Sequence, residues 1–174
     1  ETLVCLNPDC DAKKIKSFTL FVSRDAMNID GLSEATLEKF LAEGFLHTYA
    51  DLFHLDRHRD AIMQMDGFGE KSYQNLEASV EKARHTNLAR LIYSLGIPNI
   101  GIANARMICR EYKNDLDKML AAPTEELAAM DGVGPVIAGA FVDFFAQEKN
   151  KTALELLLKE VELEQETFSE EALP

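Results

Sequence analysis

The chain has 174 residues, of which 47% are hydrophobic, and its formal net charge at pH 7 is −12. The hydrophobic content is enough for a packed core, but no segment approaches the roughly 18 consecutive apolar residues of a membrane helix, so no membrane partner is expected. The acidic balance argues against a broad basic surface that binds DNA by charge alone. The excess acid lies late in the chain, because residues 13–118 carry fifteen basic and fifteen acidic residues, whereas residues 119–174 carry three and twelve.

Residues 1–24 are expected to form an irregular N-terminal arm that contains half of a zinc site. Four residues separate Cys5 from Cys10, and two cysteines about one turn apart are typical of half a four-cysteine zinc site. Two thiolates are too few to hold Zn²⁺ stably, so this chain alone is not expected to keep the metal. An unused pair of loop cysteines is the alternative. An odd total of three cysteines argues against a disulfide framework and for a reducing compartment, here the cytoplasm.

Arg24 is the first candidate DNA-binding residue. It stands in the segment Ser23-Arg24-Asp25-Ala26-Met27, where its guanidinium would lie near a phosphate. An ion pair between Arg24 and the neighbouring Asp25 is an equally good interpretation, and the sequence does not decide between the two.

Four short segments then recur along the chain, each with a glycine after an apolar and a polar residue. We place the leading glycines at positions 31, 67, 101 and 132, separated by 36, 34 and 31 residues. Repetition at such a period indicates one small unit copied several times. Downstream of the glycines, apolar residues fall on one face of a helix. The sequence therefore predicts an all-α fold, in which each copy is a helix, a tight glycine hairpin and a second helix.

These hairpins predict a surface that binds anions. Glycine permits a positive φ and a close approach of the backbone to an outside group, and the apolar residue after it anchors the turn. The second helix begins with free N–H groups and the positive end of its dipole, which favour an anion. A repeated site of this kind suits a periodic polyanion, so we expect the backbone of a nucleic acid as the ligand.

The first hairpin, Gly31-Leu32-Ser33, departs from the pattern because a serine replaces the second glycine. Ser33 is expected to cap a helix over residues 34–43, which weakens the case for a phosphate contact at this hairpin. Its role in packing is the safer expectation.

The second hairpin, Gly67-Phe68-Gly69, matches the pattern best. Lys71 and the amides near Gly69 are our first choice for a phosphate contact, and the helix is expected to reach about residue 84. The alternative is that the glycines only make a tight turn between helices. Phe68 is expected to pack into its own hairpin in preference to forming an exposed wedge against DNA.

The last two hairpins are less regular. In Gly101-Ile102-Ala103 an alanine replaces the second glycine, and Arg106 and Arg110 are expected to line a phosphate track on the following helix. The fourth copy, Gly132-Val133-Gly134, precedes a helix without basic residues, so a phosphate contact there would use backbone N–H groups. Residues 161–174 are rich in Glu and predict a solvated acidic linker.

The two cysteines, the Ser-Arg segment and the four ordered hairpins together resemble the bacterial NAD-dependent DNA ligases, from about Cys5 to Leu158. The resemblance implies the second half of a zinc finger (residues 1–24) and a helix-hairpin-helix domain (residues 25–160), with the other two zinc ligands just upstream. The chain begins with Glu1, so we expect a fragment from which the adenylation, OB and BRCT domains are absent. The resemblance also implies that the whole enzyme uses NAD and magnesium to seal nicks in duplex DNA during replication and repair, while this part grips the backbone across the minor groove.

No catalytic constellation stands out in the sequence, so the fragment alone is expected to be inactive. A helical repeat scaffold for protein–protein interaction is one alternative, since a period near 34 with paired helices also describes tetratricopeptide repeats. Those repeats do not need glycines at the turn. A structural spacer that makes no DNA contact is the other alternative, and the acidic last third of the chain favours it.

Overall fold

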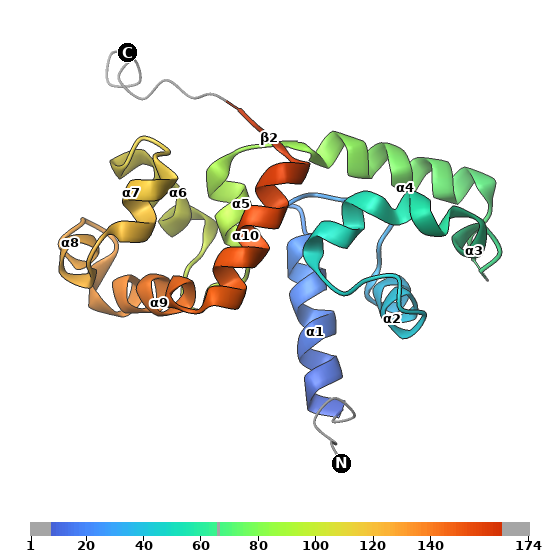
Figure 1. The fold of residues 1–174 in the computed structure, drawn as a ribbon, viewed down its shortest axis with the longest axis horizontal. Coiled ribbons are helices and arrows are strands. Elements are labelled where there is room, and N and C mark those ends of the chain that lie inside the picture. The colour runs from blue at the N-terminus through green and yellow to red at the C-terminus, as the bar shows by residue number, and fades with distance from the viewer. Residues whose placement is uncertain (1–7, 66, 165–174) are drawn as a thin grey trace. The chain divides into compact units, whose positions relative to one another are not determined.

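The structure is a computed structural model that describes residues 8–65 and 67–164, with side chains from residue 13 onwards. Its elements are almost all helices, which confirms the predicted all-α class, and the only strands in the described ranges have two residues each. In chain order (Figure 1) the elements are α1 Pro8–Phe21, α2 Glu34–Ala42, the 3-10 helix η2 Tyr49–His58, α3 Arg59–Met63, α4 Glu70–Ala83, β1 His85–Thr86, α5 Leu88–Ser94, α6 Ile102–Glu111, α7 Leu116–Ala121, α8 Thr124–Ala128, α9 Gly134–Ala146, α10 Glu148–Glu160 and β2 Glu162–Leu163.

The chain folds into two compact units, residues 1–84 and residues 85–174, called here the N-terminal unit and the C-terminal unit. The first and second hairpins belong to the N-terminal unit, and the third and fourth belong to the C-terminal unit. Each unit therefore holds a pair of hairpins with its own packed core. The sequence did not indicate this division within residues 25–160.

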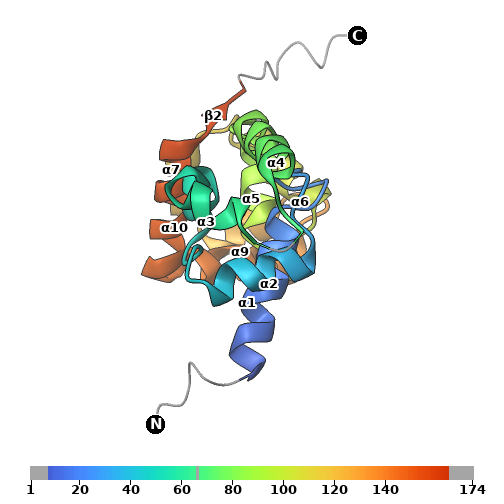
Figure 2. The same ribbon diagram turned by 90° about the vertical axis from the view of Figure 1, so that its right-hand side faces the viewer.

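The N-terminal arm differs from the prediction, because residues 8–21 form the helix α1 and not an irregular segment. Phe18 and Phe21 lie three residues apart on one face of α1, and both are buried. Their rings contact Tyr49 of η2, with centroids 5.0 Å and 4.6 Å away. Helix α1 also packs against α2 (Figure 2). The burial of two aromatic side chains, worth about 1.5–3 kcal/mol each, explains why residues 8–21 form a helix and not an irregular segment.

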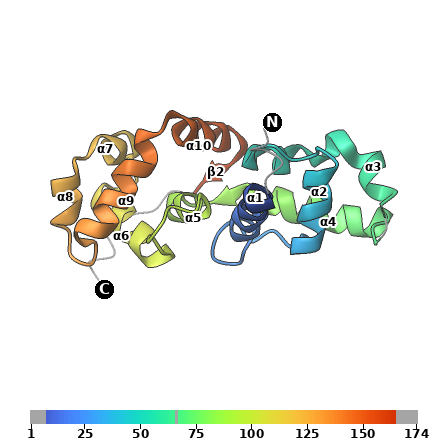
Figure 3. The ribbon, with the colours of Figure 1, turned by 90° about the horizontal axis from the view of Figure 1, so that it is seen from below.

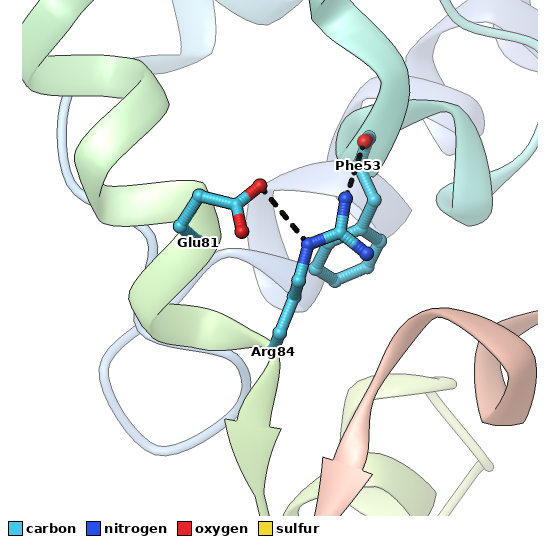
Figure 4. A network of polar contacts seen from close by, with 3 residues as sticks. All are labelled: Phe53, Glu81 and Arg84. Carbon is cyan, nitrogen blue, oxygen red and sulfur yellow. Dashed lines mark hydrogen bonds and ion pairs between the residues drawn. The ribbon is translucent and has the colours of Figure 1, made fainter.

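The core of the N-terminal unit lies between α2, η2, α3 and α4. Helix α4 contributes Tyr73, Leu76 and Val80, whose spacing of three and four residues puts them on one buried face. The end of α4 is fixed by Arg84 (Figure 4), whose Nη2 donates to the carbonyl of Phe53 at 2.7 Å. The Arg84 guanidinium also lies 5.1 Å from the centre of the Phe53 ring. Because both contacts are with one residue of η2, they hold α4 to η2.

The C-terminal unit is built around α9, which is apolar over most of its length. Helix α9 packs against α8 and α10 (Figure 3), and its residues Ala138, Phe141 and Phe145 are buried. The short strands β1 and β2 pair in parallel, so the chain just after α10 lies beside the start of the unit. The expected acidic linker therefore begins with a paired strand, and residues 165–174 lie outside the described ranges. None of the helices that the structure describes has the length and apolar character needed to cross a membrane.

Candidate nucleic-acid interface

Four turns, one before each of α2, α4, α6 and α9, contain a residue in the left-handed conformation. The φ angles are +91° at Gly31, +84° at Gly67, +68° at Asn99 and +84° at Gly132. In three of the turns the next N–H donates to the carbonyl three residues earlier, from Phe68 to Met65 at 3.0 Å, from Ile100 to Ile97 at 3.2 Å and from Val133 to Met130 at 3.2 Å. A turn with positive φ at its third position favours glycine or asparagine. The same turn therefore precedes each of these three helices.

The third hairpin has a different register from the predicted one. Gly101, predicted as the leading glycine, has a φ of −93° and is the N-cap of α6. It corresponds to Gly69, the N-cap of α4, and Asn99 supplies the left-handed residue. Ile100 is the buried anchor, with 7% of its surface exposed, whereas Ile102, predicted for that role, is the first residue of α6. The prediction was wrong because asparagine tolerates the left-handed conformation and takes the place of glycine.

The residue at each helix cap decides which N–H groups are open to a ligand. Ser33 caps α2 as predicted, since its Oγ accepts the N–H of Thr36 at 3.2 Å. Gly69 provides no side-chain cap for α4, so the first N–H groups of that helix have no intrahelical partner and no capping partner among the described residues. The N–H of Gly101 donates to Oδ1 of Asn104 at 2.9 Å, which removes this amide from the candidate phosphate ligands.

Gly69 forms a corner that is open to the outside. Its backbone is extended, with φ −150° and ψ −167°, and a Cβ added there would meet no atom within 4 Å. Gly67 is different, because its φ of +84° by itself favours glycine. None of the residues that the structure describes requires glycine at position 69. A requirement for glycine there would come from an outside group that approaches the backbone closely.

The fourth hairpin presents Gly134 at the start of α9. A Cβ at Gly134 would also meet open space, although its φ of +74° strains any other residue. Val133 is 5% exposed and anchors the turn, as Ile100 does in the third hairpin. Pro135 follows in the first turn of α9, where its missing N–H leaves fewer donors for a ligand.

Few positive charges lie at these corners. Lys71 is exposed on the first turn of α4, but Glu70 stands in the same turn, and Glu34 does so in α2. Arg106 is exposed on α6, whose first turn has no acidic residue. Because acids at a helix N-terminus oppose a bound anion, the electrostatics favour α6 and α9 over α2 and α4. Arg24 is exposed in the segment that precedes the first hairpin.

Within the N-terminal unit, each hairpin contacts the helix that follows the other hairpin. The N–H of Asp30 donates to Oγ of Ser79 on α4 at 2.7 Å. The ring of Phe68 lies 5.9 Å from that of Phe40 on α2, so Phe68 packs within its unit and is not a free wedge. The two hairpins of this unit are therefore held as a pair.

Asn104 makes the corresponding connection in the C-terminal unit, and the sequence did not predict it. Its Nδ2 donates to the carbonyl of Gly132 at 3.3 Å, which joins α6 to the fourth hairpin. The two residues are 28 positions apart, and no local pattern links them. Asn99 and Ile100 were also missed. The segment Ile97-Pro98-Asn99-Ile100-Gly101 repeats the residue types of the second hairpin at every position except Pro98, once asparagine is accepted in place of glycine.

Only part of the predicted half zinc site lies among the described residues. Cys10 lies in α1, and Cys5 lies outside the described residues. In the part of the chain with described side chains, no three His, Cys, Asp or Glu residues come together as a metal site. Cys109, the third cysteine, is buried on α6.

Residues 90–154 match the family described as the helix-hairpin-helix motif. This range lies in the C-terminal unit and contains both of its hairpins, so the family match and the geometry identify the same segment. The presence of this motif, which the sequence resemblance implied, is confirmed.

Over most of its length the chain is similar to DNA ligases. It is 54% identical over 166 residues to a DNA ligase of Lachnoclostridium phytofermentans, which covers 95% of the chain and 25% of that protein. A DNA ligase of Ruminiclostridium cellulolyticum is 49% identical over 170 residues, which covers 98% of the chain and 26% of that protein. A DNA ligase of Carboxydothermus hydrogenoformans is 40% identical over 153 residues. The chain spans about a quarter of the length of these curated relatives.

Proposed function

We propose that this chain is the non-catalytic, sequence-nonspecific DNA-binding part of an NAD-dependent DNA ligase. One observation carries the proposal: the open corner at Gly69 stands at the start of α4 without a side-chain cap, and no contact with the described residues calls for glycine there. A phosphate is the outside group that such a corner accommodates. The similarity to DNA ligases over most of the chain supplies the biological setting.

Backbone amides would carry most of the contacts with DNA. They donate to phosphate oxygens, which are the same at every base pair, so the binding has no sequence preference. Several corners would grip the two strands across the minor groove. Lys71 and Arg106, with Arg24 as a third cation, would add charge-assisted contacts.

The charge distribution predicts a shallow dependence on salt. With only about three cations at the interface, the logarithm of the binding constant should fall with the logarithm of salt concentration with a slope near −3. The affinity of the isolated chain should also be weak, because its net charge of −12 repels DNA.

The proposal for the whole protein follows from the family. It would seal nicks in duplex DNA in the cytoplasm during replication and repair, with NAD as the adenylate donor and magnesium as the metal. Its partners would be the nicked duplex and the remaining domains of the same ligase. Cys5 and Cys10 would provide two of four thiolates for a structural zinc ion. The chain alone, mixed with NAD and magnesium, should not seal a nick.

Fluorescence anisotropy with a labelled, nicked duplex at low and high salt tests the DNA-binding role. We expect binding that salt weakens and that Lys71→Gln reduces. Lys82→Gln is the matched control, because Lys82 is equally a lysine exposed on α4 but lies in the last turn of that helix. Absence of binding even at low salt would contradict the proposal and favour a spacer. Equal losses from the two variants would show general charge attraction without a contact at this corner.

A further inference from the structure

The side chain of Asn104 connects two hairpins through opposite ends of its amide. Its Oδ1 accepts the N–H of Gly101, the N-cap residue of the third hairpin, at 2.9 Å. Its Nδ2 donates to the carbonyl of Gly132, the left-handed residue of the fourth hairpin, at 3.3 Å. An uncharged amide is suited to this position because it both accepts and donates hydrogen bonds.

A second contact holds the same corner against α6. Met107 lies on α6 three residues after Asn104, and a Cβ added at Gly132 would come within 2.7 Å of its sulfur. The φ of Gly132 is +84°, which by itself favours glycine there. The fourth hairpin therefore contacts α6 at Met107 as well as at Asn104.

We propose that Asn104 is a positioning residue that fixes the third and fourth hairpin corners to each other, so that the C-terminal unit contacts two phosphates of a DNA duplex at once. This inference rests on the proposed DNA-binding function. Two linked contacts gain affinity when their separation is already set in the free protein, because binding at the second corner is then intramolecular. If the two corners can move relative to each other, part of that gain in affinity is lost.

Among its described residues, the N-terminal unit has no counterpart of this connection. The position that corresponds to Asn104, three residues after the N-cap Gly69, is Ser72, which is exposed. Its first hairpin is instead held to α4 by the bond from Asp30 to Ser79, and Gly31 lies beside Leu76, which a Cβ added at Gly31 would meet at 3.8 Å. Substitution of Asn104 should therefore change the C-terminal unit alone.

Asn104→Leu removes both hydrogen bonds at nearly the same side-chain size, and Ala121→Leu is its control, at an exposed position at the end of α7 in the same unit. We expect Asn104→Leu to weaken duplex binding by about tenfold, a fraction of the gain that a linked second contact provides. The amide proton of Gly101 should also exchange with solvent faster, because it loses its acceptor. Ala121→Leu should change neither quantity.

Asn104→Asp separates the two bonds. The carboxylate still accepts the N–H of Gly101 but has no donor for Gly132, so amide exchange at Gly101 should stay slow while DNA binding weakens. Ala103→Asp carries the same added charge one residue away and measures the purely electrostatic loss. Thermal unfolding of each variant shows that the unit is folded.

The inference is overturned if Asn104→Leu frees the Gly101 amide yet binds duplex as tightly as Ala121→Leu does. It is also overturned if the Gly101 amide exchanges equally fast in the wild type and in Asn104→Leu, because the bond would then be absent. A wild-type chain that fails to bind duplex at low salt contradicts the proposed function itself. The two failures are therefore distinguishable.

Discussion

Replacement of Gly69 by serine should raise the stability of the protein and lower its affinity for DNA. A glycine needed only for the fold would not give this combination of effects. The backbone at Gly69 is extended and a Cβ meets no atom within 4 Å, so serine fits without strain. Serine is a better N-cap than glycine by a few tenths of a kcal/mol. The lower freedom of serine in the unfolded chain adds about 0.4–1 kcal/mol. The expected gain is about 1 kcal/mol, or a rise in melting temperature of roughly 4–8 °C for a unit of this size.

The expected loss of affinity has the same structural origin. The serine Oγ would accept an N–H at the start of α4, as Ser33 Oγ accepts the N–H of Thr36 at 3.2 Å in the first hairpin. That N–H would no longer be free for a phosphate, and a hydrogen bond to a charged group is worth about 1.5–3 kcal/mol. Duplex binding measured by fluorescence anisotropy should therefore weaken by roughly tenfold or more.

The reverse substitution, Ser33→Gly, is the matched control for Gly69→Ser. It removes a cap from α2 and should lower stability by a few tenths of a kcal/mol without weakening DNA binding. A Gly69→Ser protein that melts at a higher temperature but binds duplex as well as the wild type would refute the reasoning, because the amides at this corner would then have no phosphate partner.

Three further predictions concern the packing of the units. Gly132→Ala should destabilise the C-terminal unit by roughly 1–2 kcal/mol, the cost of the left-handed backbone, because the flexible end of Met107 that the new Cβ would meet at 2.7 Å can move aside. Denaturant unfolding measures this loss, and the double variant with Met107→Ala should recover little of it. Tyr73→Phe should leave stability unchanged or raise it by up to about 1 kcal/mol in the same assay, since the buried Tyr73 hydroxyl has no hydrogen-bond partner among the described residues. Stability should fall as the pH rises above 10, because burial raises the pKa of Tyr49 above its ordinary value of 10.0, and burial with the hydrogen bond to Glu126 does so for Tyr112. The neutral phenols therefore stabilise the fold fully below pH 10 and lose that effect above it. Unfolding measured at pH values on either side of 10 would detect the loss. A free energy of unfolding that does not change over this range would contradict the assignment.

The hairpins were predictable because their geometry is local. A positive φ before a helix selects glycine strongly, and the pattern located Gly31, Gly67 and Gly132 correctly. The leading residue of the third hairpin was predicted two residues too late, because Asn99 satisfies the same backbone requirement without being glycine. With Asn99 as the leading residue, the steps between copies become 36, 32 and 33 residues, closer to regular than the predicted ones.

The contacts between hairpins were not predictable, because they depend on how helices pack. Asn104 and Gly132 are distant in sequence, and only the tertiary fold brings them to 3.3 Å. The helix α1 was missed for a related reason. Its stability comes from the burial of Phe18 and Phe21 against Tyr49, a partner about thirty residues away, while the cysteine pair drew attention to a metal site.

Titration of the isotope-labelled chain with a short nicked duplex, followed by the backbone amide signals in NMR, tests the central claim most directly. That claim is that main-chain N–H groups at the hairpin corners bind the sugar–phosphate backbone. The amides of Glu70, Lys71 and Ser72 and those of Ile102 and Ala103 should shift first and furthest, while α10 stays unchanged. Shifts that concentrate on α10 or α1 and leave these corner amides unmoved would contradict the account.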